Sequence, residues 1–557
     1  MNKKKTSTGF FIDEANPGKI HPMELSLNIK IWFACFLAFV FAATLIWRRE
    51  KDGWALLFLT LGGFCFYLMA AQLYPFLNLW DEQYHALVAK NCMTHPFQPM
   101  LYTEAILPDH DYNHWICAHI WLHKQPLFIW QIALSFKIFG VSELALRLPS
   151  VLMCTLLVPL NYRIAQLLTQ RRDIAFFTAL STAASWFLLC LTSGVIHTDH
   201  NDVCFLFYVT ASVWAFVEYA HRGSAAWQWA LLIGLFSGCA IMTKWLVGLL
   251  VYLVWGCYLL AEKGFRFREW KWGHLMAALA VTLLIVLPWQ IYCLHQFPEI
   301  ARQELLFNFQ HASTGIELHT GPWNFYLIIL PMHFFGRGPH YTDIHPVWNF
   351  DTIICYAALA VGYVLAIRAL RSKSQRITFI ATTLFVFLFF SYAKTKMPAF
   401  TFVISFVGFL SIATLLAGIY QLFSRIIHSH KILTVLMACV CTAFAVYSSN
   451  YPNFYRETDR MFFQLCTENK KQFEEWGKKI PGKGLIFNVM TPSYPYGDYT
   501  SCIPATFYSG RECYFDKPTS ETLKALQQQG RTIAVVRNPW IEDYMEQDST
   551  IIKLEMK

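Results

Sequence analysis

Long apolar runs separated by short polar segments dominate the chain up to about residue 449. A helix needs about 20 mainly apolar residues to cross the hydrocarbon core of a bilayer, and the runs predict about 12 such spans. A further run, 323–335, is too short to assign. The predicted spans cover residues 30–47, 54–75, 143–168, 174–193, 203–219, 227–243, 246–261, 275–294, 351–368, 376–392, 399–420 and 431–448.

The last part of the chain has a different, polar pattern. "KGLIFNVM" (483–490) and "TIAVVRN" (532–538) predict short buried strands. "SETLKALQQQ" (520–529) predicts a helix with Ser520 as its N-cap and with Leu523 and Leu526 on one face. These elements predict a small α/β domain.

The pattern therefore predicts three parts and a polytopic α-helical membrane protein. Residues 1–53 form an N-terminal tail with an extra apolar span, and 54–449 form the main transmembrane region. Residues 450–557 form the α/β domain.

Composition supports a membrane protein. Of 557 residues, 55% are hydrophobic and 15% are charged, whereas about a quarter of the residues of a soluble domain are charged. The net charge of +9 is spread over connecting loops. Because basic and aromatic residues do not cluster as a nucleic-acid binder requires, we expect no nucleic-acid partner.

The charges instead predict topology, because Lys and Arg concentrate in cytoplasmic loops. The alternation of spans then places the segments 76–142, 194–202, 295–322 and 393–398, and the tail after 449, on the outer side. It also places the N-terminus outside, against the preference of its lysines. The predicted inner loops are 48–51, 170–173, 221–223, 262–272, 368–376 and 424–431.

The 16 cysteines have no CxxC spacing, so they predict no structural zinc site. Most lie in apolar runs, where Cys behaves as a small hydrophobic residue. Cys466, Cys502 and Cys513 fall in the outer tail, and a Cys502–Cys513 disulfide is the first pairing we expect there.

The two long outer loops, 76–142 and 295–322, are rich in aromatic residues. Loops of this length without structure of their own are usually functional or disordered, and these are too aromatic for disorder. We expect short helices along the membrane surface in the first loop. Two such loops on one side of a membrane indicate a cavity there.

The first loop opens with an acidic pair in "FLNLWDEQYHALVAKN" (76–91). Asp81 is a candidate N-cap of the segment that follows it, and also a candidate catalytic carboxylate; the two roles can coexist. Neighbouring residues on a helix point about 100° apart, so Glu82 is assigned a supporting role.

Cationic residues on the same side are candidates for binding an anion. Lys124, just before Pro126, either extends its ammonium to the interface or binds a phosphate. Lys394 and Lys396 lie on the outer side, where positive charge is disfavoured, and a bound anion explains them. Arg147 begins an apolar span, where a charge is functional or anchors the helix end.

Further acidic, aromatic and histidine residues complete the candidates. Asp199 and Asp202 are either caps of a polar turn or part of an acidic site. The i, i+4 pairs among four histidines allow a divalent cation, although no cofactor is required by the sequence. These histidines are His110, His114, His119 and His123.

Seven segments occur in an order that resembles a known superfamily. They are "WDEQYHALVAKN", "HKQPLFIWQIALSFKIFGVSELALRLPSVL", "TDHND", "AIMTKWLVGLL", "LPWQIYCL", "HTGPWNFYL" and "AKTKMPAF". Over about residues 54–415 the chain resembles the GT-C glycosyltransferases of the protein O-mannosyltransferase and aminoarabinose (lipid A) transferase superfamily. The run at 30–47 has no counterpart there.

The resemblance implies a GT-C fold of about 12–13 transmembrane helices with a small extracytoplasmic C-terminal domain. Its length and small tail look more like the bacterial aminoarabinose transferases. These imply a bacterial inner-membrane glycosyltransferase whose site faces the periplasm. The donor is a sugar on a polyprenyl phosphate, and the acceptor is a lipid, a glycan or a protein.

The resemblance also assigns residues. The acidic residue of the first loop matches Asp81, and the lysine before proline matches Lys124, although this chain has "HKQP" where the commoner form is "EKP" or "KPP". The second acidic position matches Asp199, with Asp202 as a rival, and the late KxP-type motif matches Lys396.

The implied chemistry is loss of a polyprenyl phosphate. Lys124, Lys394, Lys396 and Arg147 would stabilise charge on the leaving phosphate. Tyr84, Asp202, His319 and Trp323 are candidates for the acceptor or sugar pocket. The competing functions are protein O-glycosyl transfer and, from another class, a transporter or flippase of lipid-linked sugars.

Overall fold

In this computed structural model the described residues are 25–107, 115–116, 118–196, 199–222, 226–315, 319–340, 344–455, 458, 460–489, 501–539 and 541–555. The chain forms two compact units. Of the described residues, unit 1 contains 74–146 and the tail from 458, and unit 2 contains 25–73 and 147–455. The first outer loop therefore packs with the C-terminal tail in one unit. The prediction from the sequence had put the loop and the tail in separate parts.

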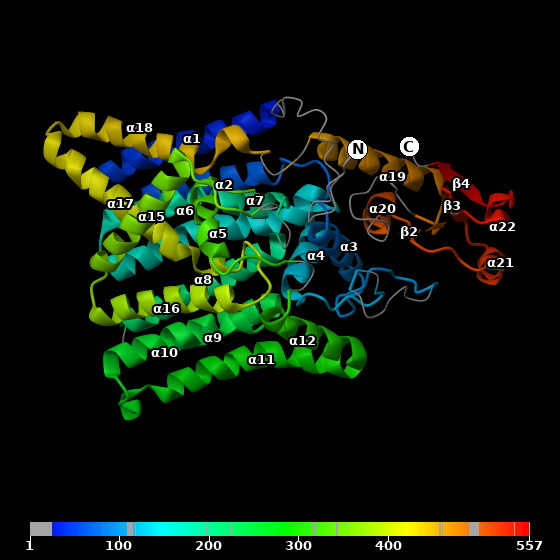
Figure 1. Ribbon diagram of the computed structural model, residues 1–557, viewed down its shortest axis with the longest axis horizontal. Helices are drawn as coiled ribbons and strands as arrows, with labels where there is room; N and C mark the ends of the chain where they lie inside the picture. Colours follow the sequence, from blue (N-terminus) through cyan, green and yellow to red (C-terminus); the bar gives the residue numbers. More distant parts are fainter. Residues whose placement is uncertain are drawn as a thin grey trace. The chain divides into compact units, whose positions relative to one another are not determined.

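Unit 2 is built of helices, and its long helices run with roughly aligned axes (Figure 1). They are α1 (Leu27–Arg48), α2 (Asp52–Ala70), α5 (Glu143–Thr169), α6 (Arg172–Ala183), α7 (Trp186–Ser193), α8 (Asp199–Arg222), α9 (Trp227–Lys244), α10 (Leu250–Lys263), α11 (Trp272–Gln296), α12 (Pro298–Ser313), α13 (Phe325–Ile328), α14 (Leu330–Phe335), α15 (Phe350–Ala369), α16 (Lys373–Tyr392), α17 (Ser405–Ile426) and α18 (His430–Ser448).

The described residues contain 11 helical segments long and apolar enough to cross a membrane. Ten of the 12 predicted runs lie within them, and the runs 54–75 and 399–420 extend past Asp52–Ala70 and Thr401–Ile426 by five and two residues, so the predicted polytopic helical class is confirmed. The counts differ at Trp227–Lys263, which is one continuous candidate. There α9 ends at Lys244, Trp245 adopts φ 56°, and the following turn packs back on α9, where Ser237 Oγ donates to the Gly248 carbonyl at 2.8 Å. The run 323–335 forms the short helices α13 and α14.

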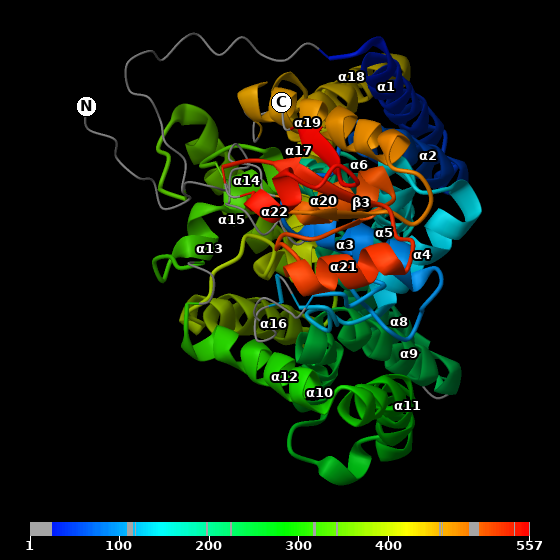
Figure 2. The same cartoon turned by 90° about the vertical axis from the view of Figure 1, so that its right-hand side faces the viewer.

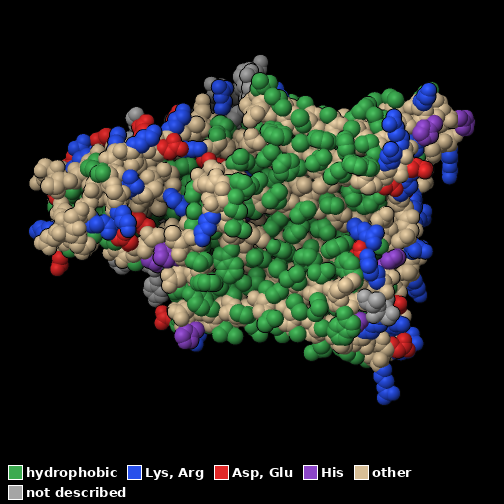
Figure 3. Space-filling view, turned by 180° about the vertical axis from the view of Figure 1, so that it is seen from behind, with side chains coloured by type: hydrophobic (Ala, Val, Ile, Leu, Met, Phe, Trp, Pro, Cys, Tyr) green, Lys and Arg blue, Asp and Glu red, His purple; other side chains and the backbone are tan. Residues whose placement is uncertain are grey.

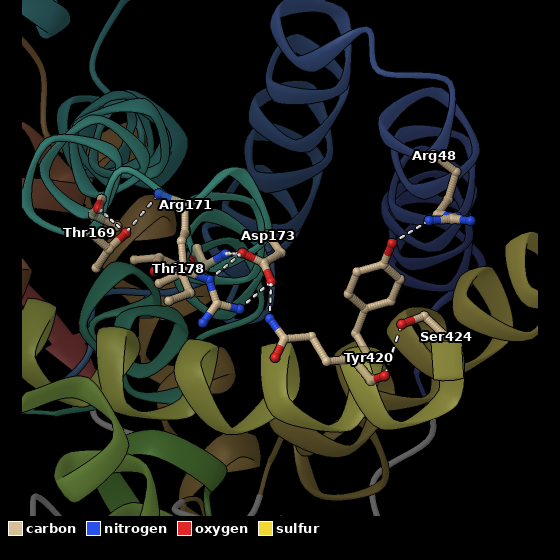
Figure 4. Close-up of polar contacts among 10 residues, drawn as sticks. Arg48, Thr169, Arg171, Asp173, Thr178, Tyr420 and Ser424 are labelled. Atoms are coloured by element: carbon tan, nitrogen blue, oxygen red, sulfur yellow. Dashed lines mark hydrogen bonds and ion pairs between the residues drawn. The ribbon is translucent and has the colours of Figure 1, made fainter. Parts of the chain in front are cut away.

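Basic residues gather at one end of the apolar surface of unit 2 (Figure 3). There Arg172 donates to the Trp47 carbonyl and to Asp52, each at 2.7 Å. In Figure 4, Arg48 reaches Tyr420 and Arg171 reaches Asp173. This end carries the predicted inner loops, so the structure gathers the positive charges that the sequence assigns to the cytoplasmic side.

Unit 1 contains a parallel four-stranded sheet in the order β2-β1-β3-β4. Figures 1 and 2 show α19 and α21 on opposite sides of this sheet. Leu485, Phe487, Ile533 and Val535 alternate along their strands and pack with Leu523 and Leu526 of α21. The elements are α3 (Asp81–Cys92), α4 (Leu127–Phe139), α19 (Arg460–Lys479), β1 (Leu485–Phe487), α20 (Cys502–Ser509), β2 (Glu512–Cys513), α21 (Ser520–Gln528), β3 (Ile533–Arg537), α22 (Asp543–Glu546) and β4 (Ile552–Glu555).

The structure confirms the predicted α/β tail and corrects two of its details. The N-cap of α21 is Thr519, whose hydroxyl accepts the Thr522 N–H at 3.2 Å, so the assignment of Ser520 was one residue late. The expected Cys502–Cys513 disulfide is wrong, because Cys466, Cys502 and Cys513 are buried free thiols. The sulfurs of Cys502 and Cys513 face different partners, the Tyr102 hydroxyl at 3.5 Å and the Ser509 hydroxyl at 3.6 Å.

Close helix packing in unit 2 gives a first prediction. A methyl group at Gly362 of α15 would lie 2.3 Å from the Ser411 carbonyl oxygen of α17. Because backbone cannot move aside easily, Gly362→Ala should lower the free energy of unfolding by about 1–3 kcal/mol. The matched control is Gly256→Ala in α10, where nothing lies within 4 Å. Thermal melting of the purified proteins compares the two, and equal melting temperatures would contradict this packing.

Candidate active site

Asp81 is the first residue of α3, and it is not the N-cap. The N-cap position is Trp80, which has φ 62° and makes no side-chain capping bond. The capping interpretation of Asp81 is therefore wrong. A carboxylate in the first turn is still favoured there by the partial positive charge of the helix N-terminus.

Asp81 forms an ion pair with Lys124, the residue that the sequence assigned to a phosphate. Lys124 Nζ lies 3.7 Å from Asp81 Oδ2, and the two side chains are 17% and 9% exposed. Removing one member of a buried pair leaves an uncompensated charge, so each holds the other in place. Unit 1 thus joins the two strongest candidates, which lie 43 positions apart in the sequence.

Glu82 and Tyr84 are both buried and make local ties. Glu82 Oε2 accepts the Asn78 N–H at 2.5 Å, which fixes the turn before α3. The Tyr84 hydroxyl donates to the Ile116 carbonyl at 2.9 Å and so joins α3 to the later part of the loop. These contacts support the helix that carries Asp81; direct roles for Glu82 and Tyr84 in catalysis stay predictions.

Aromatic rings pack on His85 and on His123, the residue before Lys124, within unit 1. Trp115 stacks on His123 with ring centroids 4.4 Å apart, and His85 packs edge-on against Phe128 at 4.7 Å. Burial lowers the pKa of His85 to about 3, and nearby Lys124 acts in the same direction while Asp81 opposes it. His85 is therefore neutral at physiological pH.

The histidine series is only partly visible. His110 and His114 lie outside the described residues, His119 is partly buried and His123 is buried in the aromatic cluster. Among the residues that the structure describes, no group of three or more His, Cys, Asp or Glu side chains could hold a metal ion. A divalent cation at this series stays a prediction.

Two side chains of the tail hold the backbone that leads into Asp81. The Tyr508 hydroxyl accepts the Leu77 N–H at 2.8 Å, and Lys470 Nζ donates to the Pro75 carbonyl at 2.8 Å. Both also bind Glu143 Oε1, at 2.8 Å and 2.6 Å. Sequence reasoning missed these residues, because they are hundreds of positions from Asp81 and belong to no motif.

Unit 2 contains a second buried acid–base pair. Asp202 Oδ1 lies 2.5 Å from Lys244 Nζ, with exposed fractions of 6% and 20%. His200 Nδ1 is 2.8 Å from the Ser150 hydroxyl, and both residues are buried. Lys244 belongs to a matched motif but had no assigned role. Asp199 is the first residue of α8, and its side chain lies outside the described part.

The cationic side chains of unit 2 that are candidates for phosphate binding differ in their burial and in the hydrogen bonds that they already make. Arg147 is fully buried and donates to the Ala71 carbonyl at 3.0 Å. Lys394 is exposed. Lys396 Nζ donates to the carbonyls of Phe390, Ser391 and Ala393 at the end of α16.

Lys396 therefore has a role that the sequence did not predict. An ammonium has three N–H donors, and all three are used by carbonyls. In this conformation Lys396 caps a helix and does not offer a donor to a phosphate. Nearby, the backbone carbonyl of His319 accepts the Lys396 backbone N–H at 2.8 Å, and the Trp323 side chain is 75% exposed.

Comparison with known proteins identifies related sequences. Residues 123–292 match the family model described as dolichyl-phosphate-mannose-protein mannosyltransferase. The undecaprenyl phosphate-alpha-4-amino-4-deoxy-L-arabinose arabinosyl transferase of Erwinia tasmaniensis is 27% identical over 310 residues, 52% of this chain and 49% of that protein. A similar transferase of Proteus mirabilis is 26% identical over 309 residues, 53% of this chain and 50% of that protein. The chain thus spans about half the length of the curated relatives it matches.

The fold is also similar to a solved structure. The crystal structure of ArnT from Cupriavidus metallidurans bound to undecaprenyl phosphate has a TM-score of 0.58 and 16% identity, covering 86% of this chain and 88% of that one. The apo structure of the same protein has a TM-score of 0.55. Together the family model and this fold confirm the predicted GT-C resemblance.

The ties from the tail give a second prediction. Tyr508→Phe leaves the Leu77 N–H without its acceptor, and a buried group left unsatisfied is destabilised by about 1–3 kcal/mol. We expect amide hydrogen exchange at residues 75–82 to become roughly tenfold faster or more, since 1.4 kcal/mol is a factor of ten. Mass spectrometry of peptides from the exchanged protein measures this.

The matched control for Tyr508→Phe is Tyr514→Phe. The Tyr514 hydroxyl donates to the Glu104 carbonyl at 2.7 Å, a different part of the same loop. Tyr514→Phe should leave exchange at residues 75–82 unchanged. Equal exchange in both variants would show that Tyr508 does not hold this segment.

The neutral His85 gives a pH prediction. Its pKa is about 3 in the folded protein and about 6.5 when unfolded, so the unfolded state binds more protons between these values. As the pH falls from 6.5 towards 3, His85 should therefore reduce stability by about 1.4 kcal/mol per pH unit. Melting of the wild type and of His85→Gln across this range should show a shallower acid loss in the variant; parallel curves would contradict it.

Proposed function

We propose that this protein is an integral-membrane glycosyltransferase. It transfers a sugar from a polyprenyl-phosphate-linked donor to a lipid A-like lipid or a glycan on the extracytoplasmic face of the bacterial inner membrane. The observation that carries the proposal is the buried Asp81–Lys124 pair at the first residue of α3. In the sequence, Asp81 follows the apolar span Asp52–Ala70 by eleven positions, and the fold is similar to that of ArnT.

The reaction we propose is a direct displacement at the anomeric carbon. An oxygen of the acceptor forms the new bond to this carbon, and the bond from the carbon to the phosphate oxygen breaks. The electron pair leaves with the polyprenyl phosphate. Because attack and departure occur on opposite faces of the sugar, the configuration inverts.

Cationic side chains support departure of the phosphate. Charge develops on the phosphate oxygens as the bond breaks, and fixed cations in a water-poor site stabilise it by several kcal/mol. Lys124 is our first candidate, and the roles of Arg147 and Lys394 of unit 2 stay predictions from the sequence. Because Lys124 is paired with Asp81, a shift of the Lys124 ammonium towards the phosphate changes the surroundings of both the ammonium and the Asp81 carboxylate.

The role of Asp81 depends on the acceptor. If the acceptor is a hydroxyl, Asp81 takes its proton as a general base. If the acceptor is an ionised phosphate, no proton has to be removed, and Asp81 positions the acceptor or steadies positive charge on the sugar. The names of the Erwinia and Proteus relatives favour a donor in which aminoarabinose is carried on undecaprenyl phosphate.

A protein acceptor is the second candidate, favoured by the family model that matches residues 123–292. A transporter or flippase should place its ionisable groups near the membrane midplane, on paired broken helices. Asp81 and Lys124 lie instead in unit 1, at the first residue of α3 and shortly before α4. This placement favours an enzyme.

The test is reconstitution with an undecaprenyl-phosphate-linked sugar and candidate acceptors, with released undecaprenyl phosphate as the readout. Asp81→Asn should lower the release about 100-fold or more, the range for loss of a catalytic acid or base. Release also separates an enzyme from a flippase, which moves the lipid without breaking the glycosidic bond.

The matched control is Glu104→Gln, which removes another carboxylate of unit 1 from its ion pair with Arg531 at 2.7 Å. It should retain activity. Circular dichroism confirms that both variants are folded. Near-normal turnover by Asp81→Asn would remove this residue from the catalytic role, and translocation of the donor without release would sink the proposed function.

A further inference from the structure

Unit 2 contains a cavity of about 430 Å³ at its basic end. It lies among α5, α8, α10 and α16. Its walls include Leu167, Phe216, Val217, Val254, Phe379 and Phe406, so they are largely apolar. This volume is within the range of small-molecule sites, about 300–1,000 Å³.

The cavity runs from the helix ends towards the middle of the bundle. Along α16 its lining extends from Gln375 to Thr382, and along α8 from His221 back to Val213. At 1.5 Å per residue, the distance from the start of α16 to Thr382 is roughly 14 Å. This is about half of a 30 Å hydrocarbon core, the depth that one acyl chain of a single leaflet reaches.

The rim of the cavity is polar and positive. Arg371, Ser372 and His221 line it, and no carboxylate does among the lining residues. Arg371 is exposed, and within the described part of the chain its guanidinium makes no hydrogen bond or ion pair. By contrast, some other arginines of this end are paired, as Figure 4 shows for Arg171 with Asp173.

The deep end carries one unused donor. The Thr382 side chain lines the cavity and is 3% exposed, and among the described residues its hydroxyl has no hydrogen-bond partner. Thr378, one turn earlier, donates instead to the Ser374 carbonyl at 2.8 Å. A buried hydroxyl without a hydrogen-bond partner is unfavourable, so the position of Thr382 favours a water molecule or a ligand atom at the deep end of the cavity.

We propose that this cavity binds an anionic phospholipid of the cytoplasmic leaflet. Its phosphate contacts Arg371 and the start of α16, where the helix N-terminus favours an anion. One acyl chain enters between α8 and α16 and ends near Thr382, whose hydroxyl contacts a water molecule or an oxygen of the lipid. Basic pockets between helices on the cytoplasmic side are suited to acidic headgroups.

The charge and the depth together select this ligand. A free anion would use the rim and leave the apolar walls exposed to water. A zwitterionic lipid would fill the walls but bring a second positive charge to Arg371. An anionic lipid matches both the apolar walls and the positive rim. The cavity lining does not include Asp81 or Lys124, so this proposal does not depend on the proposed function.

The experiment measures retained lipid by native mass spectrometry of the purified protein, titrated with phosphatidylglycerol or with phosphatidylcholine of the same chains. Phosphatidylglycerol should bind at least fivefold more tightly than phosphatidylcholine. Arg371→Gln should weaken phosphatidylglycerol about tenfold, the effect of one charged contact. Arg368→Gln, an exposed arginine of α15 that does not line the cavity, should bind as the wild type does.

A second variant tests the apolar part. Ala220→Phe fills the cavity from α8 and should weaken both lipids, while its melting temperature in lipid-free detergent stays that of the wild type. If Ala220→Phe unfolds, Thr382→Leu replaces it.

Four outcomes would overturn the proposal: equal binding of the two lipids, unchanged binding by Arg371→Gln, competition by inorganic phosphate, or displacement of phosphatidylglycerol by undecaprenyl phosphate. The last would assign the cavity to a polyprenyl tail.

Discussion

The structure depends on one constraint, which is that a charge buried in an apolar chain must have a partner. Of the residues, 55% are hydrophobic, so few polar groups are available to solvate an ion inside. Asp81 pairs with Lys124 and Asp202 pairs with Lys244. Arg147 and Lys396 use backbone carbonyls instead. The charged side chains that are candidates for catalysis therefore also fix the ends of loops and helices. The sequence alone does not distinguish the catalytic role of such a side chain from its structural role.

How much the sequence predicts follows from this constraint. Spans depend on local apolar length, so all the predicted runs appear as helices. The strands at 485–487 and 533–537 are likewise short, buried runs, whereas β2 has two residues and β4 alternates apolar with charged positions. Asp81 and Lys124 were identified from motifs, but their pairing was not, because it joins distant segments. The capping interpretation of Asp81 was wrong because Trp80 occupies the N-cap position with φ 62°, a backbone conformation that the amino-acid sequence does not reveal.

Partners that lie far apart in the sequence were the least predictable. Nothing near Asp81 indicates that Tyr508 accepts the Leu77 N–H, or that Glu143 joins Tyr508 to Lys470. Lys396 shows the opposite case, in which a motif drew attention to a side chain that the fold uses to cap α16. A motif identifies the residue type that a chemistry needs, whereas the contacts around it decide whether that side chain is available.

Unit 1 is assembled from residues 74–146 and from the tail after 458. A ribosome makes the first of these segments long before the second. The first outer loop therefore lacks its contacts with Tyr508 and Lys470 while residues 147–457 are synthesised and inserted. Because domains form as their chain emerges, the segment that leads into Asp81 gains its contacts with Lys470 and Tyr508 only after residue 508 has been made.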